Sequence, residues 1–161
     1  MTDEKKAIFT YLVSKLNEKT DQVGKTTVQK MMYFLKRMGL VDYEYTLYHY
    51  GPYSFEVENE LEQLESSGIL DISWDPDRGY FIRLAEGYDL SELGTSVKEA
   101  IDFLVEKFGQ KRAKDLSLIA TVLYFYGRLP ESEIIETVKS LKPQFSELEV
   151  RKTLEVVKEI F

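Results

Sequence analysis

The chain's single histidine lies among tyrosines, and this is the first place where its residues could do acid–base chemistry. The segment reads YEYTLYHYGPYS over residues 43–54, with His49 between Tyr48 and Tyr50. A catalytic histidine needs a nucleophile and an orienting group beside it. Ser54 is near in sequence, but its spacing does not impose that geometry. We therefore predict no catalytic role for His49. An aromatic cluster is expected instead, which either packs the core or binds a protein partner.

The run VGKTT at residues 23–27 is similar to the end of a phosphate-binding P-loop. The full motif requires another glycine five residues before Gly24, where this chain has Lys19, and a preceding strand, where the pattern here is helical. Without a glycine-rich loop, backbone N–H groups cannot surround a phosphate. We interpret the run as a loop and the start of a helix, with a capping box formed by Thr26 and Gln29.

Composition excludes several other kinds of site. The chain has 161 residues, no cysteine and one histidine, so neither a disulfide nor the usual Cys/His zinc site can form. Its carboxylates make no recognisable acid–base or metal motif, and we expect no cofactor and no enzymatic activity. No apolar run approaches the roughly 18 residues of a membrane span, and the N-terminus does not resemble a signal peptide. We therefore expect a cytoplasmic protein without membrane association.

The hydrophobic pattern predicts a mainly α-helical fold with a small β-hairpin, of the α+β class. Helices are expected over residues 4–18 and from Lys25 to a C-cap at Gly39. The aromatic segment favours a short strand, which Gly51-Pro52 is expected to break, and a third helix follows with Ser54 as N-cap. A β-hairpin is predicted next, in LDISW and YFIRL. This is the order of a winged helix-turn-helix.

The rest of the chain is predicted to be all helical, with helix caps at Ser96 and Ser146 among others. We divide the chain into a winged-helix-like domain over residues 1–86 and a helical extension packed on it over 87–161, with one continuous domain as the alternative. Apolar positions on the last helix would serve either the core or a homodimer contact: Val150, Leu154 and Val157.

The third helix, in SFEVENELEQLESSG at residues 54–68, bears on the choice between a nucleic acid and a protein as the partner. A winged helix-turn-helix would insert this helix into the major groove, with basic or amide side chains toward the bases. It carries five glutamates and no lysine or arginine, and the chain has a net charge of −7. Because affinity for DNA comes largely from neutralising phosphates, DNA is disfavoured and a basic protein partner is preferred.

We therefore predict a non-enzymatic regulatory protein that acts by protein–protein binding. The expected partner-binding residues come from the aromatic segment and the acidic helix: Tyr48, His49, Tyr50, Tyr53, Glu56, Asn59, Glu60 and Gln63. The alternative is a winged-helix DNA-binding transcriptional regulator. For that function the candidate nucleic-acid contacts are basic: Lys25, Lys30, Arg37, Arg78 and Arg83.

Three runs of the sequence resemble a known family: GKTTVQKMMYFLKRMG, YEYTLYHYGPYSFEVENELEQLESSGIL and LSLIATVLYFYG. Together they resemble the YwgA-like bacterial and archaeal proteins. They are more distantly similar to the Panacea domain, which includes SocA-like antitoxins and phage-associated proteins. The positions that carry the resemblance are Lys25, Thr26, Gln29, Lys30, Tyr33, Tyr50, Gly51, Pro52 and Ser54. The resemblance implies a compact, mostly helical, antitoxin- or adaptor-like protein that acts by binding, and it transfers no catalytic residue.

Overall fold

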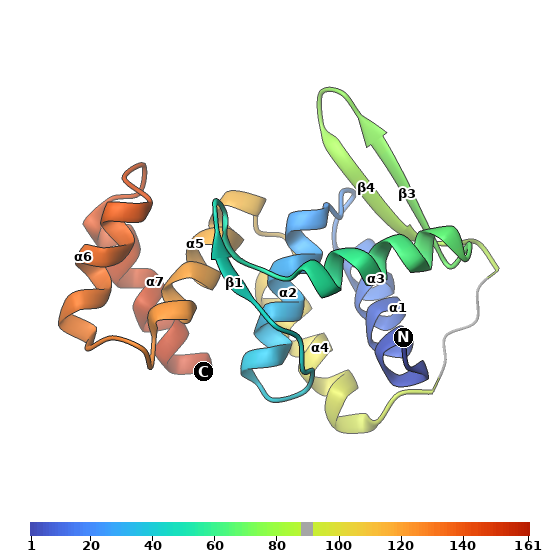
Figure 1. Ribbon diagram of the computed structural model, residues 1–161, viewed down its shortest axis with the longest axis horizontal. Helices are drawn as coiled ribbons and strands as arrows, with labels where there is room; N and C mark the ends of the chain where they lie inside the picture. Colours follow the sequence, from blue (N-terminus) through green and yellow to red (C-terminus); the bar gives the residue numbers. More distant parts are fainter. Residues whose placement is uncertain (88–91) are drawn as a thin grey trace.

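The computed structural model describes residues 1–87 and 92–161, and in this part of the chain it has seven helices and two small antiparallel hairpins (Figure 1). The predicted α+β class is confirmed. In chain order the elements are α1 (Asp3–Lys19), α2 (Lys25–Arg37), β1 (Thr46–Tyr48), β2 (Gly51–Tyr53), α3 (Phe55–Ser66), β3 (Leu70–Asp75), β4 (Gly79–Leu84), α4 (Thr95–Phe108), α5 (Ala113–Phe125), α6 (Glu131–Leu141) and α7 (Glu147–Ile160).

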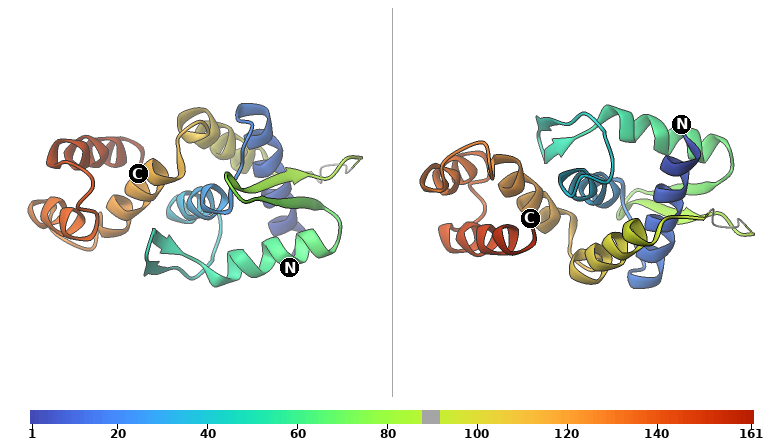
Figure 2. Two further views of the ribbon diagram at one scale, coloured as in Figure 1. Left: turned by 90° about the horizontal axis from the view of Figure 1, so that it is seen from above. Right: turned by 90° about the horizontal axis from the view of Figure 1, so that it is seen from below.

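The helices surround α2, which lies near the middle of an elongated molecule (Figure 2). At one end α6 and α7 pack together with α5, and at the other end α1 and the β3–β4 hairpin lie side by side. Buried side chains from α1 through α7 belong to one hydrophobic cluster, which crosses the predicted boundary at residue 87. The three apolar positions of the last helix, Val150, Leu154 and Val157, are buried in this cluster. They therefore serve the core.

The β3–β4 hairpin confirms the prediction from alternating residues. Leu70 pairs with Leu84 and Asp75 with Gly79, so the strands keep one register along their length. The Asp75 carboxylate accepts hydrogen bonds from the backbone N–H groups of Asp77 and Arg78, which closes the turn. Local turn chemistry and a period of two residues are sufficient to specify this element.

The β1–β2 hairpin differs from the prediction that Gly51-Pro52 breaks the aromatic strand. These two residues begin the second strand, where Gly51 pairs with Tyr48 and Pro52 with Leu47. The chain turns earlier, at His49 and Tyr50. Gly51 has φ +102°, a backbone conformation that residues with a side chain rarely adopt. Pro52 is tolerated in the strand because a two-stranded ribbon leaves one side of each strand unpaired. The prediction of a break was therefore wrong.

Two of the predicted helix caps are confirmed and two are wrong. The hydroxyls of Ser54 and Ser146 accept hydrogen bonds from backbone N–H groups in the first turns of α3 and α7. By contrast, α4 begins at Thr95, so Ser96 lies inside the helix. The capping box of Thr26 and Gln29 does not form either, because the Gln29 side chain bonds to another segment. No helix in the described ranges is both long and apolar enough to cross a membrane.

Candidate binding surface around the first hairpin

The side chain of Gln29 joins α2 to the start of α3. Its amide nitrogen donates a hydrogen bond to the carbonyl of Ser54 at 2.8 Å, and its amide oxygen accepts one from the backbone N–H of Ser54 at 3.0 Å. Both residues are buried. Backbone groups taken from water need such partners, so Gln29 stabilises the point where β2 ends and α3 begins.

Lys30, the next residue on α2, holds the hairpin itself. Its ammonium group donates a hydrogen bond to the carbonyl of Pro52 at 2.8 Å, although the residue is only 2% exposed. Burial and, secondarily, repulsion by Lys142 lower the pKa of Lys30 to about 8. An ammonium this deep is costly unless it is hydrogen-bonded, so we interpret Lys30 as a structural donor.

The lowered pKa of Lys30 predicts that stability rises with pH. Between about pH 8 and pH 10.5 the folded chain gives up this proton more readily than the unfolded chain, which therefore binds more protons. The free energy of unfolding should then rise by up to about 3 kcal/mol from this group. Urea unfolding of wild type and Lys30→Met across pH 7.5–10 checks this, because tyrosine titration is common to both proteins. A difference between the two proteins that does not change with pH would contradict the assignment.

Gly51 brings the hairpin into direct contact with α5. A Cβ atom at this position would lie 2.6 Å from the hydroxyl oxygen of Thr121 and 3.3 Å from the carbonyl of Ser117. Together with Gln29 and Lys30, this contact fixes the hairpin between α2 and α5. The motif positions that carry the family resemblance at Gln29, Lys30, Gly51, Pro52 and Ser54 are thus joined in space, and their role here is to position the hairpin.

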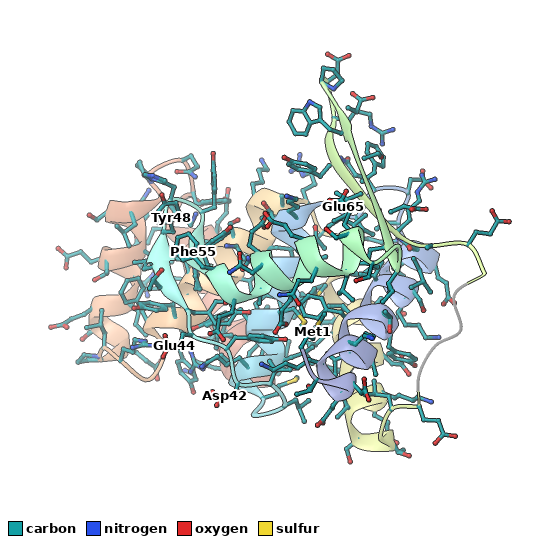
Figure 3. All side chains as sticks on the ribbon, turned by 45° about the vertical axis from the view of Figure 1, so that its right-hand side comes forward. Met1, Asp42, Glu44, Tyr48, Phe55 and Glu65 are labelled. Carbon is teal, nitrogen blue, oxygen red and sulfur yellow. The ribbon has the colours of Figure 1, made fainter. Side chains whose placement is uncertain are left out.

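The hairpin and the first residue of α3 display large aromatic side chains to solvent. Tyr48, Tyr50 and Phe55 are 55%, 70% and 61% exposed, and Tyr53 is half-buried beside them. The ring of Tyr53 lies 5.1 Å from that of Phe55 and 5.9 Å from that of Tyr48, and His49 packs edge-on against Tyr48 at 4.7 Å. Figure 3 shows Tyr48 and Phe55 as neighbours on this face. We call Tyr48, His49, Tyr50, Tyr53 and Phe55 the aromatic surface.

The five tyrosines of the predicted cluster therefore divide into two groups. Tyr43 is buried in the core, where its ring contacts Phe9 and its hydroxyl donates to Glu60. Tyr45 packs at 4.9 Å against the buried Tyr33. The two interpretations that the sequence allows, core packing and a surface for a partner, thus apply to different residues of one segment. Phe55 was not among the predicted site residues, although its place directly after the N-cap and two residues before the buried Val57 was a signal for exposure.

The acidic helix is less available to a partner than its composition suggests. Three of its carboxylates accept hydrogen bonds from other parts of the chain: Glu56 from the backbone of Glu44, Glu58 from Lys25 and Glu60 from Tyr43. The carboxylates of Glu58 and Glu60 serve as internal partners and are only partly exposed. The exposed polar side chains of α3 are Glu56, Asn59, Glu62, Gln63, Glu65 and Ser66.

Two of the five candidate nucleic-acid contacts are engaged inside the molecule. Besides Lys30, the guanidinium of Arg37 donates to the Leu123 and Tyr126 carbonyls, so it ties α2 to the end of α5. Lys30 is buried and Arg37 is half-buried. Their charge does not reveal this, since a long cationic side chain can run along apolar surface and donate to the carbonyls of other segments. These bonds make Lys30 and Arg37 less available to a nucleic acid than their charge suggests, and their role as nucleic-acid contacts stays a prediction.

Three basic candidates face solvent or a groove. Lys25 pairs with Glu58 at 2.8 Å, while Arg78 in the turn and Arg83 in β4 are exposed on the β3–β4 hairpin. A groove of about 670 Å³ lies where α2 and α5 begin, beside the tip of that hairpin. Its basic lining residues are Lys25, Arg78, Lys111 and Arg112.

Comparison with known proteins finds one relative along almost the whole chain. It is a protein of Bacillus subtilis (strain 168) named "Uncharacterized protein YwgA". The two are 28% identical over an alignment of 159 residues, and the match covers 92% of this chain and 93% of that protein. This similarity supports the YwgA-like resemblance. No family model matches the chain, and no solved structure matches it.

Proposed function

We propose that the protein is a non-enzymatic regulator, antitoxin- or adaptor-like, that binds another protein through the aromatic surface. The observation that carries this proposal is the exposure of the neighbouring rings of Tyr48 and Phe55, together with that of Tyr50 in the turn of the same anchored hairpin. Scattered exposed apolar residues are normal on any protein, but aromatic side chains gathered in one patch are typical of interaction sites. Tyrosine and phenylalanine are also enriched at interface cores.

The anchoring of the hairpin supports the proposal further. A binding surface loses affinity when it must be ordered on association, so a pre-organised surface binds more tightly than a mobile one. Here the hydrogen bonds from Gln29 and Lys30 and the contact of Gly51 with Thr121 fix the hairpin before any partner arrives. Two buried polar side chains thus serve to position the first hairpin.

The chemistry of the surrounding residues agrees with binding. The hydroxyl of Ser54 is buried and caps α3 by accepting from the backbone N–H of Val57, so it is not presented to His49 as a nucleophile. The exposed carboxylates of Glu62 and Glu65 extend along α3 from the aromatic surface. An aromatic centre with an acidic margin favours a partner that has an apolar patch edged by lysine or arginine.

Site-specific photocrosslinking in the native host tests the proposal. The photoreactive residue p-benzoylphenylalanine replaces Tyr50 in one protein and Phe103 in the control. Phe103 is an exposed aromatic residue on α4, which lies on the opposite side of α2 from the first hairpin (Figure 2). We expect a discrete protein adduct from position 50 and none from position 103. Equal labelling at both positions would contradict a dedicated aromatic surface.

A second candidate function is winged-helix nucleic-acid binding, and one observation favours it. The basic groove at the start of α2 and α5 adjoins the β3–β4 hairpin, whose place in the chain is that of a wing. Because α3 exposes carboxylates, binding would have to use the groove and phosphate contacts rather than helix insertion. The same photoreactive residue at Arg78 separates the two candidates: adducts with nucleic acid at position 78, and no protein adduct at position 50, would favour this function.

A further inference from the structure

A pocket of about 400 Å³ opens between the first hairpin and the end of α6. Its walls are apolar on the side of Leu47, Tyr48 and Leu141, and its polar lining comes from His49, Thr121 and Lys142. Gly51 also lines the pocket, and the ammonium of Lys30, which donates to the Pro52 carbonyl, lies near that glycine. The aromatic surface and this pocket share Tyr48 and His49, but the pocket's chemistry differs because it contains a lysine.

Lys142 is the unusual member of the pocket. The residue is only 6% exposed, and no hydrogen bond or ion pair joins its ammonium group to another of the described residues. Among the described residues the Tyr45 hydroxyl is the only fully enclosed side-chain polar group without a hydrogen-bond partner, so the ammonium of Lys142 keeps some contact with solvent. Lys142 is also one of the residues that line the pocket. Burial lowers its pKa. A charged group removed from water without a partner is costly, and a bound anion would remove that cost.

The neighbouring groups add positive charge and leave the pocket without a negative one. Lys30 lies close enough for Lys142 to repel it, and its ammonium would be 3.8 Å from a Cβ at Gly51. The hydroxyl of Thr121 donates to the carbonyl of Ser117 at 2.7 Å, so its oxygen is left as an acceptor. Lys142, the imidazole of His49 and the hydroxyl of Tyr48 are therefore the lining side-chain donors available to a ligand.

The charge, the apolar wall and the volume of the pocket limit the kind of ligand that it can bind. One ammonium and one imidazole suit a single negative charge, and an ion pair of this kind is strengthened by a partly desolvated site. The apolar wall of Leu47, Tyr48 and Leu141 requires an apolar body next to that charge. The volume accommodates one small organic acid or one side chain.

We propose that this pocket binds the carboxylate of an organic acid with an aromatic or aliphatic body, through the ammonium of Lys142 and with His49 at the rim. The carboxylate comes either from a free acid or from the C-terminus of a polypeptide. The pocket stands on its own contacts and does not depend on whether the aromatic surface binds a protein.

The first test uses the full chain labelled with ¹⁵N and titrated with sodium benzoate at constant ionic strength. We expect saturable shifts at the amides of His49, Gly51 and Thr121, and at least about tenfold weaker binding of the neutral isostere benzamide. Lys142→Met should lose about tenfold or more of the benzoate affinity. Lys152→Met changes an exposed lysine and alters the net charge equally, so it should bind benzoate as wild type does.

The second test distinguishes the source of the carboxylate. The peptide acetyl-Gly-Ser-Gly-Phe is titrated with a free C-terminal carboxylate and as its C-terminal amide. Tighter binding of the free peptide than of benzoate assigns the pocket to a polypeptide terminus, and the reverse order assigns it to a free acid. The proposal is overturned if benzoate and benzamide act alike on the wild-type chain, or if folded Lys142→Met binds benzoate unchanged. The comparison of benzoate with benzamide needs no variant, so it decides even if Lys142→Met does not fold.

Discussion

Replacing Gly51 with alanine is expected to lower the free energy of unfolding by about 3 kcal/mol or more. Two costs add at this position. The backbone has φ +102°, which strains any residue with a side chain, and the new methyl group would lie 2.6 Å from the Thr121 hydroxyl oxygen. Neither the hairpin nor α5 can move away easily, because the hairpin is held by Lys30 and Gln29 while α5 is packed in the core.

A matched variant separates the two costs. Gly68 also has a left-handed backbone, with φ +74°, but nothing lies within 4 Å of a Cβ there. Gly68→Ala should therefore cost only about 1–2 kcal/mol, which is the backbone strain alone. Urea unfolding of the two variants gives the comparison. If Gly51→Ala costs no more than Gly68→Ala, the hairpin is not held against α5 as described.

Replacing Gln29 with alanine is expected to cost about 2–5 kcal/mol, the second large effect. The substitution removes both hydrogen bonds to Ser54 and leaves a buried N–H and a buried carbonyl without partners. The loss occurs at the junction of β2 and α3, so we also expect faster amide hydrogen exchange in the hairpin. Unfolding by urea and hydrogen exchange measure the two effects.

Gln22 provides the control for this prediction. Its side chain also donates to two backbone carbonyls, those of Arg78 and Tyr80, but at a solvent-exposed site. Water can replace those bonds, so Gln22→Ala should change the free energy of unfolding by only about 0.5 kcal/mol. Equal costs for the two glutamines would show that burial of the Ser54 backbone does not matter, and the account of the anchored hairpin would be wrong.

The parts of the fold that were predictable are those with local causes. The β3–β4 hairpin follows from alternation of side chains and a turn closed by Asp75, and α3 and α7 begin at serine caps. The first hairpin was not predictable, because its second strand depends on contacts of Gly51 with Ser117 and Thr121, far along the chain. Local strand propensity predicts that Gly-Pro ends a strand, but here the tertiary contact with α5 outweighs that propensity.

The segment that forms the candidate site could be predicted from the sequence, but which of its side chains face solvent could not. The density of tyrosine at residues 43–53 was informative, yet no period distinguishes the buried Tyr43 from the exposed Tyr50. Gln29 was assigned to a local cap because the sequence does not show the backbone of Ser54 as a competing partner. Lys30 and Arg37 were assigned to the surface for a similar reason, since charge alone does not show that carbonyls of other segments need a donor.

The central claim is that the aromatic surface binds a protein, and the affinity of the partner captured at position 50 tests it most directly. Tyr50→Ala is compared with Phe103→Ala for both the dissociation constant and the free energy of unfolding. We expect Tyr50→Ala to weaken binding by about 30-fold or more, as for an interface hot spot, while stability stays within about 0.5 kcal/mol of wild type. Phe103→Ala should leave the affinity unchanged. An affinity that is insensitive to Tyr50→Ala, or one that falls only with loss of the folded state, would contradict the claim.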